Sequence, residues 1–217
     1  KIMELYGLNC KVNPITTDQY PTPAKRPKYS VMNCDKTINT LQINIPHWEN
    51  ALEECIQLLK QQEMLEQIDV KKIIAIAEAA GKEIMQIYDT DDFAVTDKSD
   101  NSPLTKADKA GNAVIVAALK KQYPQIPIIS EENKMIEYAD RKDWNYFWLV
   151  DPLDGTKEFI KKNGEFTVNI ALVRNGKPVL GVVGIPAKNQ MYYAVENKGA
   201  YKIDENGVET KLVVNEP

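Results

Sequence analysis

Carboxylates stand directly after two apolar runs that are typical of buried strands. Glu131–Glu132 follows IPIIS, and Asp151 and Asp154 follow YFWLV. The end of a strand holds a side chain rigidly while leaving it at the surface. We therefore expect these acidic side chains to meet at one end of a sheet, where they can bind a ligand.

The segment DPLDGT carries the residue types that a sharp turn needs. Pro152 fixes one backbone φ angle and Gly155 permits a tight turn, so Asp151 and Asp154 can converge on one point. A helix-like turn, KEFI, follows Thr156, and its first amides would face outward. Such a helix start binds anions readily.

Carboxylates beside an anion site are electrostatically reasonable only when cations lie between them. Without metal, mutual repulsion would raise one or more of their pKa values. Oxygen ligands without Cys or His favour Mg²⁺ or a similar hard ion, and a carboxylate-bridged cation pair suits two-metal phosphoryl hydrolysis. Taken alone, the acidic pair Glu131–Glu132 after a strand is usually a surface feature, and an Asp-x-x-Asp segment is usually a solvated turn. Asp108 taken alone is most simply a residue at the start of a helix. The full segment WLVDPLDGTKEF is different, because its apolar strand, proline, two aspartates, glycine and threonine all suit one geometry, a sharp turn that presents acidic groups.

The elements around these residues predict an α+β domain, with helices first and antiparallel strands later. Apolar spacing predicts a long amphipathic helix from about residue 64 to 88, and a second from about 107 to 122 with Ala110, Val114, Ala117 and Ala118 inward. Thr105 and Asp108 suit its N-terminus. After YFWLV the period becomes two, and Asn175–Gly176 and Asn206–Gly207 predict hairpins. The expected runs are FTVNIALV, PVLGVVGIP, MYYAV and AYKI.

Residues 1–63 differ in composition from the rest of the chain. They hold all three cysteines, the only histidine, a Pro-rich loop-like stretch and an expected amphipathic helix, IPHWENALEECIQLLKQQ, with Trp48, Leu52, Cys55, Ile56 and Leu59 on one face. YPTPAKRPKYSVMN and this helix resemble the C-terminal end of dTDP-4-dehydrorhamnose reductases. The glycine-rich dinucleotide turn of such enzymes does not occur, so no oxidoreductase chemistry is expected. Because the segment from Met64 onward resembles the beginning of a separate protein, we interpret the chain as a fusion or chimera with domains 1–63 and 64–217.

Residues 64–217 resemble the magnesium-dependent inositol monophosphatase family. The string DPLDGTKEFIKKNGEFTVNIALVRNGKPVLGVV is similar to its 3′(2′),5′-bisphosphate nucleotidase branch. The resemblance implies the N-terminal half of that family's sandwich: two long helices with an antiparallel sheet, here preceded by the Pro-rich and helical extension.

The resemblance also implies roles for individual residues. Glu131, Asp151 and the Leu153 carbonyl would hold one Mg²⁺, and Asp151 and Asp154 a second. Thr156, paired with Asp108, would orient the attacking water. The amides of Gly155 and Thr156 would bind phosphate oxygens, and Glu132 would have no direct role.

The implied substrate is adenosine 3′,5′-bisphosphate, a small phosphorylated nucleotide hydrolysed to AMP and phosphate, with a role in sulfate assimilation. Inositol phosphate is an alternative, because the metal motif does not discriminate between them. A reductase-derived fragment, or a module that binds metal only for stability or interaction, are the alternatives from other classes.

One part of the family pattern does not occur in this chain. The family continues into a second α/β domain with a Trp-Asp-x-Ala segment, whose Asp is a further ligand of the second metal. No Trp-Asp pair occurs before the final VVNEP. We therefore expect weak or absent turnover by this polypeptide alone, and self-association through an unpaired sheet edge.

Composition excludes several other classes of function. The chain has 217 residues, 43% of them hydrophobic, and a net charge of −4. An acidic balance predicts no sequence-independent attraction to nucleic acid or to anionic membranes. No apolar run approaches the ~20 residues of a membrane span, and no signal peptide is recognisable. The cysteine spacing predicts reduced thiols rather than disulfides or zinc, and hence a cytoplasmic location.

Overall fold

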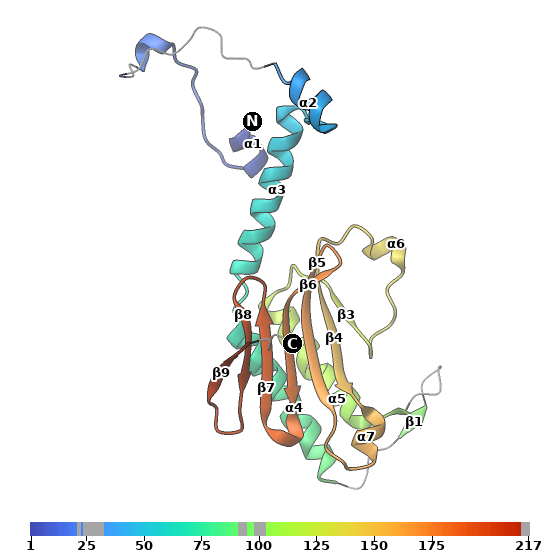
Figure 1. Cartoon of the computed structure of the whole chain (residues 1–217). Coiled ribbons are helices and arrows are strands. Elements are labelled where there is room, and N and C mark those ends of the chain that lie inside the picture. The colour runs from blue at the N-terminus through green and yellow to red at the C-terminus, as the bar shows by residue number, and fades with distance from the viewer. Residues whose placement is uncertain (21–22, 24–32, 91–94, 98–102, 214–217) are drawn as a thin grey trace. The chain divides into compact units, whose positions relative to one another are not determined.

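The computed structural model describes residues 1–20, 23, 33–90, 95–97 and 103–213. Their contacts divide the chain into two compact units, Lys1–Ile68 and Asp69–Pro217 (Figure 1). The first unit is helical, and the second contains the strands together with further helices.

The helices of the first unit are short except for the last. The unit contains α1 (Ile2–Tyr6), the 3₁₀ turn η1 (Thr17–Gln19), α2 (Asp35–Leu41) and α3 (Trp48–Glu66). The predicted amphipathic helix is confirmed, but its apolar face is not a continuous buried stripe, because Ile56 is 2% exposed whereas Trp48 is 59% exposed. The Lys60 ammonium donates to the Leu5 carbonyl at 2.8 Å and so ties α1 to α3. Much of the predicted Pro-rich loop lies outside the described residues.

The prediction of one helix from residue 64 to 88 was wrong. Helix α3 runs through residue 64 and ends at Glu66, and α4 begins only at Val70 and ends at Tyr88. The Asp69 carboxylate accepts a hydrogen bond from the Lys71 amide at 3.0 Å and so caps the start of a new helix, three residues after the old one has ended. The periodic spacing of apolar residues that predicted one helix therefore extends over two helices.

Helix α5 (Lys106–Gln122) forms where the sequence predicted it, but the predicted inward face was wrong. Ala107, Gly111, Ile115 and Leu119 are the buried positions instead. Small alanines lie on several faces of this helix, so they do not mark the buried face, whereas the larger Ile115 and Leu119 fill space against the neighbouring elements.

The second unit is built on a seven-stranded sheet in the order β3-β4-β5-β6-β7-β8-β9. Only the β3–β4 pair is parallel, so the sheet is mixed rather than purely antiparallel as predicted. The predicted α+β class is confirmed. The strands are β3 (Ile128–Ser130), β4 (Tyr146–Asp154), β5 (Thr167–Arg174), β6 (Lys177–Ile185), β7 (Gln190–Val195), β8 (Gly199–Ile203) and β9 (Glu209–Leu212).

Short elements connect these strands. The pair β1 (Thr96–Asp97) and β2 (Pro103–Leu104) precedes α5; α6 (Tyr138–Arg141) lies between β3 and β4, α7 (Thr156–Ile160) follows β4, and the 3₁₀ turn η2 (Pro186–Lys188) follows β6. In the first predicted hairpin, Asn175 and Gly176 both have positive φ, 49° and 77°, as a type I′ turn requires.

Helices α4 and α5 cover one face of the sheet (Figure 1). The core lies between them, with fully buried Ile73, Ile84 and Ile115 on the helices and Trp148 and Leu172 on the strands. Alternation along β4 sends Tyr146, Trp148 and Val150 to this core and Phe147, Leu149 and Asp151 to the opposite face. Leu149 on that opposite face is 46% exposed.

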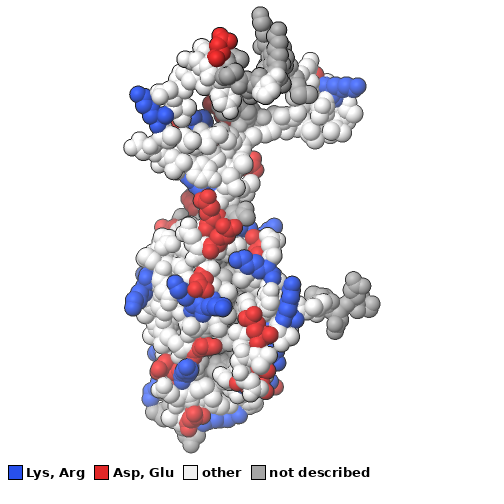
Figure 2. Space-filling model, turned by 90° about the vertical axis from the view of Figure 1, so that its left-hand side faces the viewer, with Lys and Arg blue, Asp and Glu red and all other residues white. Residues whose placement is uncertain are grey.

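The surface carries both signs of charge. On the face shown in Figure 2, the basic and acidic side chains are interspersed. Strand β9, one edge of the sheet, exposes Glu209 and Lys211, and charged residues at an edge oppose further strand pairing. Self-association through this edge stays a prediction, which light scattering would test. Among the described residues, no helix has both the length and the apolar character needed to cross a membrane.

Candidate functional site

The end of β4 turns sharply because its pairing with β5 is irregular. Asp151 pairs with Asn169 and Asp154 with Thr167, and the register shifts between these two pairs. Pro152 lies within the irregular stretch, where its missing N–H removes no ladder hydrogen bond. The two acidic residues of DPLDGT are therefore carried on the bulged end of one strand.

Gly155 makes the turn after this strand, and only glycine fits there. Its φ of +92° lies in the left-handed region, and an added Cβ would lie 2.8 Å from the Glu165 carbonyl oxygen. The first residue of α7, Thr156, is thereby aimed back toward α5. Phe159 anchors α7 in the core and packs against Phe166 with ring centroids 5.1 Å apart.

Asp108 connects the start of α5 to this turn. Its Oδ2 accepts the Thr105 amide at 2.7 Å and the Thr105 hydroxyl at 2.5 Å. The first of these bonds is one half of a capping box, in which the Thr105 side chain in turn accepts from the Asp108 amide. Oδ1 of Asp108 accepts the Thr156 hydroxyl at 3.1 Å. Asp108 is only 1% exposed, so this carboxylate is held in one orientation by three donors.

Asp151 lies in an unusual electrostatic environment. Burial, then the negative charge and hydrogen bonding of Glu131, and then the charge of Asp154 raise the pKa of Asp151 to about 7, while a backbone hydrogen bond at Leu153 opposes the shift. Oδ1 of Asp151 is buried and has no hydrogen-bond partner among the described residues. A buried carboxylate oxygen without a donor is costly unless a cation or proton satisfies it.

Glu131 is held near Asp151 by groups that the sequence reasoning missed. The Glu131 amide donates to the Val150 carbonyl at 3.1 Å, and the preceding Ser130 hydroxyl donates to Asn112 of α5 at 2.7 Å. The Asn112 amide in turn donates to Asn133 at 3.0 Å. Asn112 follows Asp108 by four residues, one helical turn, and that spacing was the available signal.

These oxygen donors fit a hard cation better than any other ligand class. Glu131 and Asp151 interact directly and Asp154 contributes charge. Leu153 lies between the two aspartates in the sequence, and its carbonyl oxygen is 3.3 Å from the Thr156 hydroxyl. Within the described ranges, no three His, Cys, Asp or Glu side chains are grouped closely enough to form a ligand set by themselves. Glu131 and Asp154 are exposed, so their side chains can rotate toward the buried oxygen of Asp151.

The structure brings two pairs of the predicted site residues together, Thr156 with Asp108 and Glu131 with Asp151. Thr156 hydrogen-bonds to Asp108 and also lies 3.3 Å from the Leu153 carbonyl oxygen. Glu131 and Asp151 line one cleft of about 640 Å³, which Lys134 and Arg141 also line. Those two cations were missed by the sequence reasoning, since nothing in the spacing of the β3–β4 connection marked them.

The raised pKa of Asp151 predicts a pH-dependent response to Mg²⁺. The folded pKa of about 7 lies above the ordinary 3.8, so the metal-free fold binds an extra proton between these values and loses stability as pH rises through this window. Mg²⁺ must displace that proton, so its stabilisation should be larger at high pH. Thermal unfolding with and without Mg²⁺ should show a greater rise in Tm at pH 8 than at pH 6.

The Glu131→Gln variant provides the check on this assignment. Removing the neighbouring negative charge should lower the pKa of Asp151 and flatten the pH dependence of the metal-free Tm. An unchanged pH profile in this variant would show that another group is responsible.

The fold and site define an α+β domain with acidic side chains at the ends of β3 and β4. The sequence matches the inositol monophosphatase family over residues 63–216, and the chain belongs to that family. Residues 1–61 match the RmlD substrate binding domain, which supports the reductase resemblance of this segment. Both predicted resemblances are thus confirmed.

Individual relatives agree with this assignment. The 3′(2′),5′-bisphosphate nucleotidase CysQ of Escherichia coli O6:H1 is 51% identical over 146 residues, which cover 67% of this chain and 58% of that protein. The crystal structure of CysQ from Bacteroides thetaiotaomicron, a member of the same family, is 50% identical, with a TM-score of 0.55 over 66% of this chain and 52% of that one. This chain therefore spans just over half the length of these relatives.

A further solved relative was crystallised with ligands. An IMPase/NADP phosphatase complexed with Mg²⁺ and phosphate is 25% identical, with a TM-score of 0.56 over 67% of this chain and 52% of that one.

Proposed function

We propose that this chain takes part in Mg²⁺-dependent hydrolysis of adenosine 3′,5′-bisphosphate to AMP and phosphate. The hydrogen bond from Thr156 to the buried Asp108 is the observation that carries this proposal, and the buried, partnerless oxygen of Asp151 is consistent with a cation there. Nucleotidase relatives with about 50% sequence identity support the substrate class. The relative whose structure contains Mg²⁺ and phosphate supports the cofactor.

The residues that would hold Mg²⁺ are Glu131, Asp151, Asp154 and the Leu153 carbonyl. Two such ions, when bound, would polarise the phosphoryl group and neutralise the charge that develops during displacement. Asp151 is suited to bridge them, because it is the least exposed carboxylate of the set and feels the charge of both others.

Thr156 would act as the group that positions the attacking water. Its hydroxyl is a donor, with the Asp108 carboxylate at 3.1 Å and the Leu153 carbonyl oxygen at 3.3 Å as acceptors, so the lone pairs of the hydroxyl oxygen stay available to accept. A water that donates to this oxygen is held with its own lone pair free for the phosphorus. Asp108 is kept from rotating by Thr105, so the acceptor that it offers to Thr156 is fixed as well.

The amides of Gly155 and Thr156 would bind the phosphate oxygens. They stand at the start of α7, where the first N–H groups of a helix have no partner within the helix. The left-handed φ of Gly155 sets the direction of these amides. Phosphate would then lie between the amides and the cations, with both stabilising its negative charge.

Phosphate release would test the proposal and its alternatives together. The chain with Mg²⁺ is mixed in excess with adenosine 3′,5′-bisphosphate or with inositol 1-phosphate, so that a single slow turnover can be measured. We expect faster release from the nucleotide, at a low absolute rate for this chain alone. A preference for the inositol ester would favour the inositol phosphatase alternative. Saturable Mg²⁺ binding without release from either ester would favour a non-catalytic module.

The variant Thr156→Val should lower the rate of this release by roughly 100-fold or more, because a group that positions the reacting water is lost. Thr156→Ser keeps the hydroxyl and should retain most of the rate. Both changes leave the carboxylates intact, so Mg²⁺ affinity by calorimetry should be nearly unchanged. Equal rates for the Val and Ser variants would remove Thr156 from the mechanism.

A further inference from the structure

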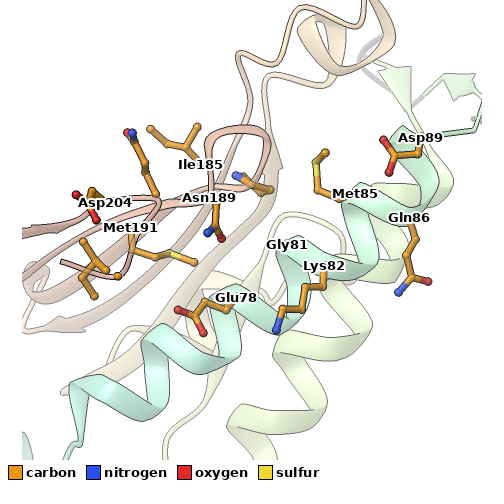
Figure 3. A pocket seen from close by; sticks show the side chains of 14 residues that line it. Glu78, Gly81, Lys82, Met85, Gln86, Asp89, Ile185, Asn189, Met191 and Asp204 are labelled. Carbon is orange, nitrogen blue, oxygen red and sulfur yellow. The ribbon is translucent and has the colours of Figure 1, made fainter. Parts of the chain in front are cut away.

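A groove along α4 is separate from the candidate metal site. It has a volume of about 580 Å³ and lies between α4 and the segment that runs from the end of β6 through η2 to β7 and β8 (Figure 3). None of the residues proposed to bind metal, water or phosphate lines it. Its volume is within the range of small-molecule sites, ~300–1,000 Å³.

Helix α4 packs closely against η2 at Gly81. An added Cβ on Gly81 would lie 3.2 Å from Cγ of Pro186, so glycine allows this close approach without displacing Pro186. Glu78, Lys82, Met85 and Asp89 lie on the same side of the helix and form one wall of the groove (Figure 3).

The floor of the groove is apolar and is formed by side chains from both walls. Met85 projects from α4, and Ile185, Met191 and Ile203 come from the opposite wall. Methionine side chains adjust their shape to different apolar partners, which suits a site for a flexible or aromatic ligand body. The floor therefore favours an organic ligand over a simple ion.

The rim carries more negative than positive charge. Glu78, Asp89 and Asp204 supply three carboxylates, and Lys82 is the single ammonium among the lining residues. In the part of the chain that the structure describes, Glu78, Lys82 and Asp89 form no ion pair with one another or with other side chains. Asp204 uses Oδ1 to accept the amides of Asn206 and Val208. The groove should therefore favour a cation and reject an anion.

We propose that this groove binds a small organic cation, an amine with an apolar or aromatic body. The apolar part would lie on the methionine floor, and the ammonium group would meet one of the two carboxylates, Glu78 or Asp89, that stand at opposite ends of the groove (Figure 3). The inference is independent of phosphatase activity, because it uses no residue of the candidate metal site.

The test uses dansylcadaverine, which joins an aromatic fluorophore to a primary ammonium by an alkyl chain. Titration of the full chain should give a saturable, blue-shifted increase in fluorescence. The analogue with a carboxylate in place of the ammonium should bind at least tenfold more weakly. Met85→Lys should weaken binding of the amine by more than tenfold, whereas Met135→Lys, at an exposed position outside the groove, should not.

A second variant tests the charge without changing the floor. Glu78→Gln with Asp89→Asn removes the carboxylate at each end of the groove and should weaken amine binding roughly fivefold, as the loss of an exposed ion pair would. Glu137→Gln with Asp140→Asn removes the same charge elsewhere and should have no effect. Circular dichroism confirms that each variant is folded. The proposal is overturned if the wild type does not bind the amine, if both probes bind equally, or if the groove variants bind like the wild type.

Discussion

Replacing Asp151 with Asn is expected to lower the affinity of the chain for Mg²⁺ by ~100-fold or more. Loss of a group that merely supports a metal ligand already costs roughly 10- to 100-fold, and Asp151 is proposed as a direct ligand of both ions. The substitution keeps the shape of the side chain but removes the charge. Isothermal titration with Mg²⁺, repeated with Mn²⁺, measures the effect.

Asp140→Asn is the matched control for this experiment. It removes the same charge from an exposed position on α6 and should leave Mg²⁺ affinity within about twofold of the wild type. If Asp151→Asn binds Mg²⁺ as tightly as the wild type, the metal site is elsewhere. Absence of binding in both proteins would contradict the metal proposal itself.

Replacing Gly155 with Ala is expected to lower the free energy of unfolding by roughly 2–4 kcal/mol. The left-handed φ of +92° is unfavourable for a residue with a Cβ, and the new Cβ would lie 2.8 Å from the Glu165 carbonyl oxygen and 3.2 Å from Cα of Phe166. Both of those atoms are backbone, so neither can move alone. Urea unfolding of the wild type and the variant measures the difference.

Gly176→Ala separates the two contributions to this cost. Gly176 also has a positive φ, +77°, but an added Cβ there would have no neighbour within 4 Å. This variant therefore reports backbone strain alone and should lose only about 1 kcal/mol. Equal losses in the two variants would show that the contact with Glu165 is not important.

The two variants Asp151→Asn and Gly155→Ala also bear on the proposed chemistry in different ways. Gly155 sets the path of the chain from Asp154 to Thr156, so Gly155→Ala should disturb phosphate release even in the folded fraction. Asp151→Asn should act through metal affinity and leave the hydrogen bond between Thr156 and Asp108 in place. A comparison of the two therefore separates loss of the cations from displacement of the turn.

Local patterns in the amino-acid sequence were enough to predict most of the elements and the chemical types at the site. A period of two along much of β5 to β8 indicates strands, because side chains on a strand alternate between two faces. The string DPLDGT indicates a sharp acidic turn, since Pro and Gly restrict the backbone in ways that other residues do not. The capping residues Thr105 and Asp108 are also recognisable locally, because a cap bonds to amides within its own helix turn.

Tertiary structure decided which of these local features meet. The contact between Thr156 and Asp108 joins residues 48 positions apart, and no local spacing encodes it. The buried face of α5 depends on which neighbours offer space, so alanines on several sides of the helix did not reveal it. The break between α3 and α4 was missed because apolar periodicity continues across it, whereas the carboxylate of Asp69 caps the start of a new helix. The groove along α4 likewise lies between segments that are far apart in the sequence, which only the packed fold brings together.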